Sequence, residues 1–333
     1  MKVVVSSDRT VRLEERDIPK IKDHYVLIKT KYSAISPGTE LSQIETSDGR
    51  KVCLGYSAMG EAVEVGEGVD RIAKGDYVAC YGAPYVQHAE YLLVPKTLCC
   101  KVPDHVDPKA AALGGLGAIA IHALRTANLQ FGEWALVAGL GILGQLIAQI
   151  AHASLYRVIP YDVSEARAES FRQTAGIPAF TTLRDLERTI ERETKGYGVD
   201  AVLLCAGGKH SPLTGDSLSW VRDKGKVVIV GDIEPVFPRE RMFAKEAEIL
   251  ISRAGGPGRY DPVFEKQAVD YPYGFVRWTE GRNVEEFIRI VAEGRINVSP
   301  YLTEVVGLDQ IEDAYAELVD KQSPVLTKII KYE

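Results

Sequence analysis

ALVAGLGILGQLIAQIA, residues 135–151, is the stretch that decides the fold of this chain. It opens as an apolar strand, turns at Gly139, Gly141 and Gly144, and continues with the apolar pattern of a buried helix. Glycines at this G-x-G-x-x-G spacing permit a tight turn, a close approach of backbone N–H groups to a pyrophosphate, and close packing of helix on strand. The N-terminus of the helix adds unpaired N–H donors. The stretch therefore predicts a dinucleotide-binding turn, which also includes Ile142 and Leu143. A glycine turn without a ligand is the alternative.

A second predicted strand indicates which dinucleotide is bound. Residues 157–161 lead into Asp162, which lies 18 residues after Gly144. A carboxylate at this place accepts hydrogen bonds from the adenosine ribose and repels a 2′-phosphate, so we expect NAD. Arg167 follows five residues later. Because an arginine there can stack on adenine or reach a phosphate, NADP is the less favoured alternative.

Strands and helices alternate through residues 133–253, which predicts a parallel, doubly wound α/β sheet. The helical patterns cover 164–176 and 183–197. The strand patterns are 135–139, 157–162, 179–183, 200–207, 226–232 and 248–253.

The parts on either side of this alternation have a different pattern. The first 110 residues consist of short apolar runs between Gly, Pro and Asp turns, which predicts a partly closed antiparallel barrel or sandwich. A helix is expected to start at Asp107-Pro108. Residues 255–280 are typical of an ordered loop. Helices at 283–294 and 308–321 and strand regions at 299–306 and 325–332 are expected after it.

Composition restricts the classes of partner. The formal net charge of −6 argues against nucleic acid or an acidic membrane as the main partner. No apolar run approaches the roughly 18 residues that span a bilayer, and the first residues have no signal-peptide pattern, so we expect a cytoplasmic protein. Five cysteines without framework spacing indicate reduced thiols.

The chain resembles the medium-chain dehydrogenase/reductase superfamily over nearly its whole length. The segments that carry the resemblance are GEAVEVGEGVDRIAKGDYVA (60–79), the glycine turn, and LDQIEDAYAELVDKQSPVLTKIIKY (308–332). Within the superfamily it resembles the branch of bacteriochlorophyllide dehydrogenase-like proteins and the medium-chain half of two-domain sugar-pathway oxidoreductases. That likeness is carried by SAISPGTELS (33–42), LGYSAMGEAVEVG (54–66), QHAEYLLVP (87–95) and residues 256–280.

The resemblance implies the domain organisation and the assembly. It implies a GroES-like β-barrel catalytic domain at 1–112, a Rossmann domain at 113–255 and a return to the catalytic domain at 256–333. It also implies a homodimer paired through strands near Ser299–Thr303, and a separate sugar-pathway oxidoreductase is a conceivable partner. The turns after the fourth and fifth strands of the sheet would line the nicotinamide; they contain Cys205, Ala206, Gly207, Val230 and Gly231.

The resemblance also shows where zinc relatives carry their ligands. They have a Cys after the third barrel strand, a His-Glu pair before the V-x-x-V-G strand, and a Cys or Glu on the helix that leads to the cofactor domain. Here these places read Ser36–Glu40, Tyr56-Ser57 and Gly114–Leu116, and the four-cysteine structural lobe is missing. Since a catalytic zinc needs about three protein donors, we expect no metal. A rearranged site would have to draw on residues without ligand spacing, namely Glu40, Cys53 and His88.

Without a metal, side chains must stabilise alkoxide charge and move the proton. Tyr56 stands at a metal-ligand position; a lowered pKa would let its phenol act as acid or base, and packing is the alternative. Thr39 lies where the superfamily often has a proton-relaying hydroxyl, or it makes a turn hydrogen bond. Glu40 is either a structural partner, which we favour, or a general base. His88 suits proton shuttling, or it is structural.

The loop at 255–280 carries the candidate substrate-binding residues. Charged, hydroxyl and aromatic groups mixed in this way suit a polyhydroxylated small molecule, and a connector held by its own salt bridges is the alternative. The candidates are Arg259, Tyr260, Tyr271, Arg277 and Trp278.

The sequence as a whole predicts a zinc-independent, NAD-linked oxidoreductase that interconverts a secondary alcohol and a ketone on a sugar, cyclitol or related polyol. One alternative is an NADPH-dependent enone or quinone reductase. Another is a cofactor-binding regulatory or structural protein with little turnover.

Overall fold

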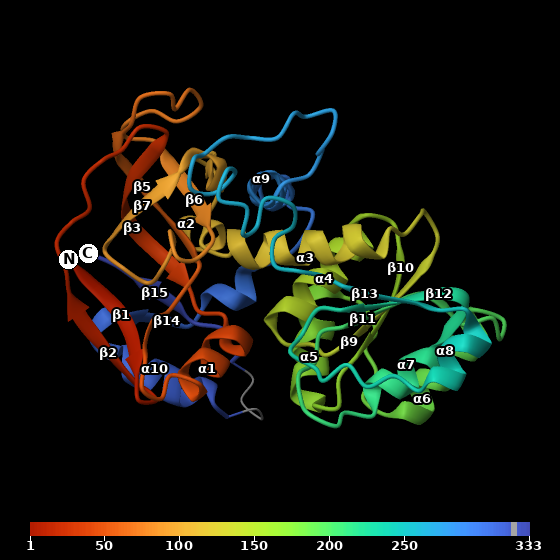
Figure 1. Cartoon of the computed structure of the whole chain (residues 1–333). Helices are drawn as coiled ribbons and strands as arrows, with labels where there is room; N and C mark the ends of the chain where they lie inside the picture. Colours follow the sequence, from red (N-terminus) through yellow and green to blue (C-terminus); the bar gives the residue numbers. More distant parts are fainter. Residues whose placement is uncertain (321–324) are drawn as a thin grey trace. The chain divides into compact units, whose positions relative to one another are not determined.

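The computed structural model describes residues 1–320 and 325–333, which form two compact units (Figure 1). Unit 1 contains residues 1–119, 254–294 and 298–333, and unit 2 contains 120–253 with 295–297. The sequence analysis expected the divisions at 112/113 and 255/256. The helix α3 (Gly114–Ala127) begins in unit 1 and ends in unit 2.

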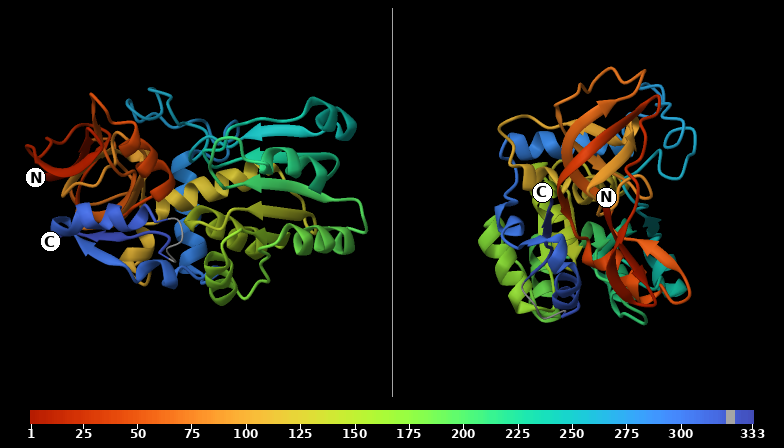
Figure 2. Two further views of the ribbon diagram at one scale, coloured as in Figure 1. Left: turned by 90° about the horizontal axis from the view of Figure 1, so that it is seen from below. Right: turned by 90° about the vertical axis from the view of Figure 1, so that its left-hand side faces the viewer.

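Unit 2 is built on a parallel sheet, as predicted, with five of the six expected strands (Figure 2). Its order is β10-β9-β11-β12-β13, and every neighbouring pair is parallel. The helices α6, α7 and α8 lie on one face of the sheet and α4 on the other (Figure 1). Apolar side chains of α6, α7 and α8 pack in one cluster with those of the strands. The strands are β9 (Trp134–Ala138), β10 (Arg157–Tyr161), β11 (Val199–Leu204), β12 (Val221–Ile229) and β13 (Glu248–Ile251). The helices are α4 (Ile142–Ala153), α5 (Glu165–Ala175), α6 (Leu183–Glu193), α7 (Leu213–Trp220) and α8 (Arg239–Lys245).

The predicted strand at 179–183 is wrong. Among the described residues only Phe180 pairs with the sheet, through one parallel bridge to Tyr161. The chain turns into α6 directly afterwards, because Thr182 is its N-cap and accepts a hydrogen bond from the N–H of Asp185 at 3.1 Å. The β-branched threonines at this place therefore serve a cap rather than a strand.

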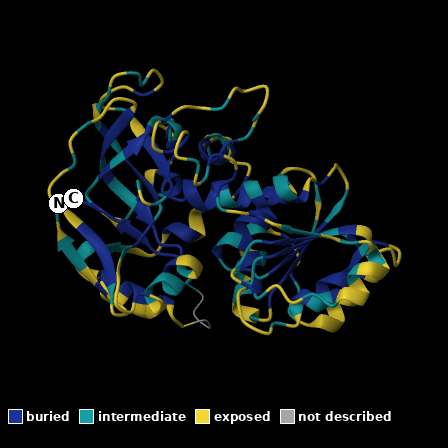
Figure 3. Ribbon diagram, viewed as in Figure 1, coloured by how far each residue is buried: buried dark blue, intermediate teal, exposed yellow. Residues whose placement is uncertain are grey.

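Unit 1 holds two sheets, which agrees with the β-rich, GroES-like half expected from the sequence. A three-stranded antiparallel sheet contains β1 (Lys2–Ser7), β2 (Thr10–Glu15) and β4 (Lys51–Cys53). The larger sheet has the order β14-β15-β3-β5-β6-β8, with β7 paired to β3. Its strands are β3 (Tyr25–Ala34), β5 (Ser57–Val65), β6 (Tyr77–Tyr81), β7 (Tyr91–Pro95), β8 (Cys99–Lys101), β14 (Val305–Gly307) and β15 (Ile329–Lys331). The central strands are the most buried part of the unit (Figure 3).

The helices of unit 1 lie where they were predicted, with ends that differ by up to about three residues. Asp107 caps α2 (Pro108–Ala111) and accepts the N–H of Lys109 at 2.8 Å, as expected. The helix α9 spans Glu280–Ala292. The helix expected at 308–321 is α10 (Ile311–Leu318), and residue 321 lies outside the described residues.

The strand expected near Ser299–Thr303 is not formed. Ser299–Leu302 is a 3-10 turn instead, and the strand β14 begins only at Val305. Pro300 explains the difference, because it has no N–H for a strand ladder but suits the first turn of a helix. The backbone that was expected to pair with a second copy is therefore helical.

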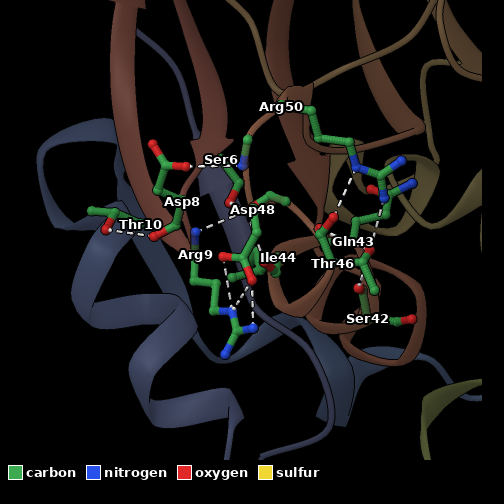
Figure 4. Close-up of polar contacts among 12 residues, drawn as sticks. Ser6, Asp8, Arg9, Thr10, Ser42, Gln43, Ile44, Thr46, Asp48 and Arg50 are labelled. Carbon is green, nitrogen blue, oxygen red and sulfur yellow. Dashed lines mark hydrogen bonds and ion pairs between the residues drawn. The ribbon is translucent and has the colours of Figure 1, made fainter.

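The helix α1 (Pro37–Glu45) is anchored at its C-terminal end (Figure 4). Ser6 and Ser47 share a hydroxyl hydrogen bond of 3.0 Å, and the Nε atom of Arg9 donates to both carboxylate oxygens of Asp48 at 3.0 and 3.1 Å. The N–H of Gly49 donates to Asp8 at 3.0 Å. These contacts tie the end of α1 to the β1–β2 turn and fix the helix that carries two of the candidate catalytic residues.

Residues 254–279 contain no helix or strand, so the expected ordered loop is confirmed. Three hydrogen bonds attach this loop to the barrel. Tyr25 donates to the carbonyl of Lys266 at 2.7 Å, Thr97 donates to that of Phe264 at 2.9 Å, and the N–H of Gly255 donates to the hydroxyl of Tyr81 at 2.9 Å. Among the described helices, none has both the length and the apolar character needed to cross a bilayer.

Candidate active site

A cluster of three hydroxyl groups lies in unit 1, on Ser36, Thr39 and Tyr56. The phenol of Tyr56 donates a hydrogen bond to the Oγ atom of Ser36 at 2.6 Å and also interacts with the Thr39 hydroxyl. Ser36 is buried, Tyr56 is half-buried and Thr39 is exposed. The ring of Tyr56 packs edge-on against that of Tyr81, with centroids 5.8 Å apart. The predicted catalytic residues Tyr56 and Thr39 therefore lie together, and Ser36 contributes a third hydroxyl to the cluster.

The surroundings of Tyr56 raise the pKa of its phenol. Burial is the main cause and the nearby charge of Glu40 adds to it, while the hydrogen bonds to Ser36 and Thr39 oppose it. The lowered pKa considered in the sequence analysis is therefore not what this environment produces. At neutral pH Tyr56 therefore holds its proton and can donate a hydrogen bond, and the raised pKa makes it a weaker acid than a free phenol.

Glu40 is fully buried and its carboxylate is used by the fold. One oxygen accepts the N–H of Ser36 at 2.7 Å, and the other contacts Nε2 of His88 at 2.9 Å and accepts the hydroxyl of Tyr315. Charge-assisted bonds of this kind are among the strong ones in proteins. Glu40 thus fixes Ser36, the direct partner of Tyr56, and its fully buried side chain is not exposed to a ligand.

His88 is fully buried as well, and both ring nitrogens have partners. Its Nδ1 atom lies 2.7 Å from the hydroxyl of Ser33, which in turn lies 2.8 Å from that of Tyr332. Gly55 has a φ of +94°, and a Cβ there would lie 2.7 Å from the imidazole, so the backbone is pressed against the ring. His88 therefore joins separate parts of the barrel in this structure.

Sequence reasoning missed four members of this network. Ser36 lies within the motif that was read for zinc ligands but was not nominated, and its place before a helix-starting proline was an available signal. Ser33, Tyr315 and Tyr332 gave none, since Tyr315 meets Glu40 across 275 residues of sequence.

The loop at 254–279 uses its predicted substrate-binding residues largely for its own contacts. Arg259 is paired with Glu265 at 2.5 Å and lies 4.3 Å from the ring centroid of Tyr260. The phenol of Tyr271 donates to Asp261 at 2.5 Å. The connector alternative therefore describes Arg259 and Tyr271 well.

The other loop candidates lie nearer the surface. Tyr260 is 55% exposed. Arg277 is exposed and its guanidinium lies 3.6 Å from the ring centroid of Trp278 and 4.4 Å from that of Tyr273. Arg277 and the two aromatic rings form a stacked surface, and binding of a ligand there stays a prediction.

The glycine turn in unit 2 has the geometry that a dinucleotide requires. Gly139 has a φ of +104°, and a Cβ on Gly144 would lie 1.8 Å from the carbonyl oxygen of Gly139. A Cβ on Gly141, in contrast, would meet nothing within 4 Å. Packing thus requires glycine at 139 and 144. Gly141 faces open space, where the absence of a side chain would let a pyrophosphate come close to the backbone. Ile142 and Leu143 open α4 directly behind this turn.

Asp162 has a role that sequence reasoning did not foresee. Its two carboxylate oxygens accept the N–H groups of Leu140 at 2.6 Å and Ser164 at 2.8 Å, so it ties the glycine turn to the end of β10. Arg167 lies 3.9 Å from the same carboxylate, and its buried Nε atom has no hydrogen-bond partner among the described residues. Carboxylate oxygens accept more than one hydrogen bond, so ribose binding by Asp162 stays a prediction.

The turns after β11 and β12 pack against each other beside the glycine turn. A Cβ on Gly231 would lie 2.4 Å from the carbonyl oxygen of Ala206, and a Cβ on Gly139 would lie 2.6 Å from the N atom of Ala206. Val230 donates its N–H to the end of β11. Burial raises the pKa of Cys205 to about 12, so its thiol is protonated at neutral pH. Cys205, Ala206, Gly207, Val230 and Gly231 thus lie at the carboxyl ends of parallel strands, where such sheets bind ligands.

The residues at the three zinc positions do not fit a zinc ion. They offer the hydroxyls of Ser36, Thr39 and Tyr56, the carboxylate of Glu40, which is already bonded, and glycines at the start of α3. Over residues 1–320 and 325–333, no three His, Cys, Asp or Glu side chains are grouped as metal ligands would be.

The fold and the glycine turn define a dinucleotide-dependent oxidoreductase with a barrel domain. Residues 22–120 match the family model for the alcohol dehydrogenase GroES-like domain, and residues 143–268 match that for zinc-binding dehydrogenases. The zinc-named match covers none of the three ligand positions. The chain belongs to the medium-chain dehydrogenase/reductase superfamily, whose members are nicotinamide-dependent.

Relatives of this chain carry the names of polyol enzymes. D-xylulose reductase A of Aspergillus oryzae is 26% identical, with 95% of this chain and 92% of that one covered. Sorbitol dehydrogenase of Halalkalibacterium halodurans is 26% identical over 80% of this chain and 90% of that one. The crystal structure of 2R,3R-butanediol dehydrogenase from Bacillus subtilis superposes with a TM-score of 0.78 at 21% identity, over 100% of this chain and 99% of that one. The last likeness establishes the fold.

Proposed function

We propose that this protein is a zinc-independent, NAD(H)-dependent oxidoreductase that interconverts a secondary alcohol and a ketone on a sugar, cyclitol or related polyol. The observation that carries the proposal is the phenol of Tyr56, which donates a hydrogen bond to Ser36 at 2.6 Å and stands at the place where the resemblance puts a histidine ligand of zinc relatives. The names of the relatives support the class of substrate.

The residues of unit 1 supply the proton chemistry in this proposal. Bound NADH or NAD would give or take the hydride. Tyr56 donates a hydrogen bond and then its proton to the substrate oxygen, which stabilises the developing alkoxide. Thr39, the exposed member of the hydroxyl cluster, exchanges the proton with water. Glu40 acts indirectly by holding Ser36, and its charge adds to the effect of burial in raising the pKa of the phenol.

The cofactor preference rests on Asp162. Its charge lies at the end of β10, where it disfavours a 2′-phosphate. The unpartnered Nε atom of Arg167 is the observation in favour of NADPH, and with it of the enone or quinone reductase alternative.

Titration with NADH and NADPH, metal analysis, and a screen of polyols, keto-sugars and enones test the proposal together. We expect tighter NADH binding, less than stoichiometric zinc, and turnover of a polyol or keto-sugar. NADPH preference with enone turnover would establish the reductase alternative, and tight binding without turnover would establish the regulatory one. The homodimer, a sugar-pathway partner enzyme and the cytoplasmic location stay predictions; light scattering after size exclusion tests the first.

A further inference from the structure

Glu280 is a buried carboxyl that the proposed chemistry does not use. It is the first residue of α9, it is 0% exposed, and neither carboxyl oxygen has a hydrogen-bond partner among the described residues. Its backbone N–H donates to the carbonyl of Pro257 at 2.9 Å, so it meets the start of the loop at 254–279. An ionised carboxylate without partners in such a place is costly.

The backbone on both sides of Glu280 is packed closely against the barrel and the loop. A Cβ on Gly281 would lie 2.0 Å from the carbonyl oxygen of Thr97, so the first turn of α9 presses against the barrel. A Cβ on Gly255 would lie 2.6 Å from the ring of Tyr81 and 3.1 Å from the Cβ atom of Glu280. The loop therefore begins between a barrel tyrosine and this glutamate.

The charges around Glu280 do not balance if it ionises. Arg259 is already paired with Glu265 at 2.5 Å, and these side chains are only 11% and 8% exposed. Phenols supply the other titratable groups that face it: Tyr81 from β6, Tyr85 after that strand, and Tyr271 from the loop. An ionised Glu280 would give two buried carboxylates and one guanidinium.

Burial raises the pKa of Glu280 to about 9, the charge of Arg259 opposes this shift, and Glu265 adds to it. A helix N-terminus alone favours the ionised form, so burial outweighs the helix here. At neutral pH the group carries its proton.

We propose that Glu280, in its neutral form, is a positioning residue that holds the loop at 254–279 on the barrel, and that the hold weakens as the pH rises. The assignment of this loop to substrate binding rests on the proposed function, but the attachment of the loop does not.

The direction follows from linkage. A released Glu280 ionises near its ordinary value of 4.5, and the buried one ionises near 9. The stabilisation of the attached loop is therefore complete below pH 4.5 and is lost progressively as the pH rises to about 9. Each pH unit in that window makes release about tenfold easier.

Hydrogen exchange of backbone amides in the loop measures release directly. After correction for the intrinsic rate, we expect the opening constant of the wild type to rise about tenfold per unit between pH 6 and 8. Glu280→Gln should show a flat opening constant. Glu285→Gln, an exposed neighbour on the same helix, should follow the wild type. Amides of β3 report global unfolding, which also exposes Glu280, so their opening constant should rise with pH as well but stay far below that of the loop.

Three results would overturn the proposal. They are a flat wild-type opening constant, a Glu280→Gln variant that titrates like the wild type, and loop amides that open no more often than those of β3. If Glu280→Gln does not fold, carbon NMR of the wild type with labelled glutamate decides, since a carboxyl titrating near 9 is required and its absence refutes the proposal.

Kinetics then separate the proposal from the function on which it draws. With a substrate found, KM of the wild type should rise between pH 7 and 9 with kcat unchanged, and KM of Glu280→Gln should not. A pH-dependent opening of the loop without any turnover would refute the proposed function alone. A KM that is independent of pH in the wild type would refute the positioning role in substrate binding.

Discussion

Replacing Tyr56 by Phe tests the central residue of the proposed mechanism. Phenylalanine keeps the ring that packs against Tyr81 and removes only the hydroxyl. The lost group is the donor to Ser36 and, in the proposed reaction, the donor to the substrate oxygen.

The structure allows the two effects of this change to be estimated separately. Ser36 loses its donor in a buried place, which should cost about 1–2 kcal/mol of unfolding free energy. A positioned general acid contributes about 10²–10⁴-fold to the rate, which corresponds to about 3–5 kcal/mol in the barrier. The activation barrier should therefore rise by more kcal/mol than the free energy of unfolding falls.

The matched control is Ser36→Ala, which removes the same hydrogen bond but keeps the phenol. Reduction of the ketone substrate is followed at the nicotinamide absorbance near pH 7, and unfolding is followed by denaturant titration. We expect similar stability losses in the two variants and a large loss of kcat only in Tyr56→Phe. A kcat within about threefold of the wild type, far below the expected effect of a general acid, or equal losses in both variants, would refute the role of Tyr56 as proton donor.

Three further changes test other parts of the structure. Gly144→Ala should destabilise unit 2 and lower its melting temperature, whereas Gly141→Ala should leave melting unchanged and weaken NADH binding measured by fluorescence, because only the first Cβ meets protein atoms. Glu40→Gln removes a charge that raises the pKa of Tyr56, so the alkaline limb of the pH–rate profile for ketone reduction should move to lower pH. Asp162→Asn should raise NADPH affinity relative to NADH in equilibrium titrations, and an unchanged ratio would remove Asp162 from cofactor selection.

The fold was accessible from sequence where local patterns and tertiary packing agree. The glycine turn and the apolar strands predicted the parallel sheet of unit 2, since strands covered on both faces must be apolar throughout. The failures occurred where a single residue changed the local structure. Thr182 caps a helix where a strand was expected, and Pro300 starts a 3-10 turn where a strand was expected.

The candidate site was less accessible, because its partners are distant in sequence. Tyr56 and Thr39 were nominated through the family motif, and the structure brings them together. The network around Glu40 needs Tyr315 from the far end of the chain, which no local pattern indicates. Glu280 looks like an ordinary residue at a helix start, where carboxylates are common. Its protonated state follows only from its burial beside Glu265.

The charge at the catalytic position determines the direction of proton transfer that this site favours. A zinc ion would bring positive charge, which acidifies an alcohol and helps its oxidation. Here burial, and to a smaller extent the charge of Glu40, raise the pKa of the phenol of Tyr56, so the resting site keeps its proton more firmly than a free phenol does. In the proposed reaction, reduction of the ketone begins from the protonation state that already prevails at neutral pH. Alcohol oxidation has to begin with loss of a proton that burial and Glu40 both retain, so in the proposed reaction it should need a higher pH than reduction.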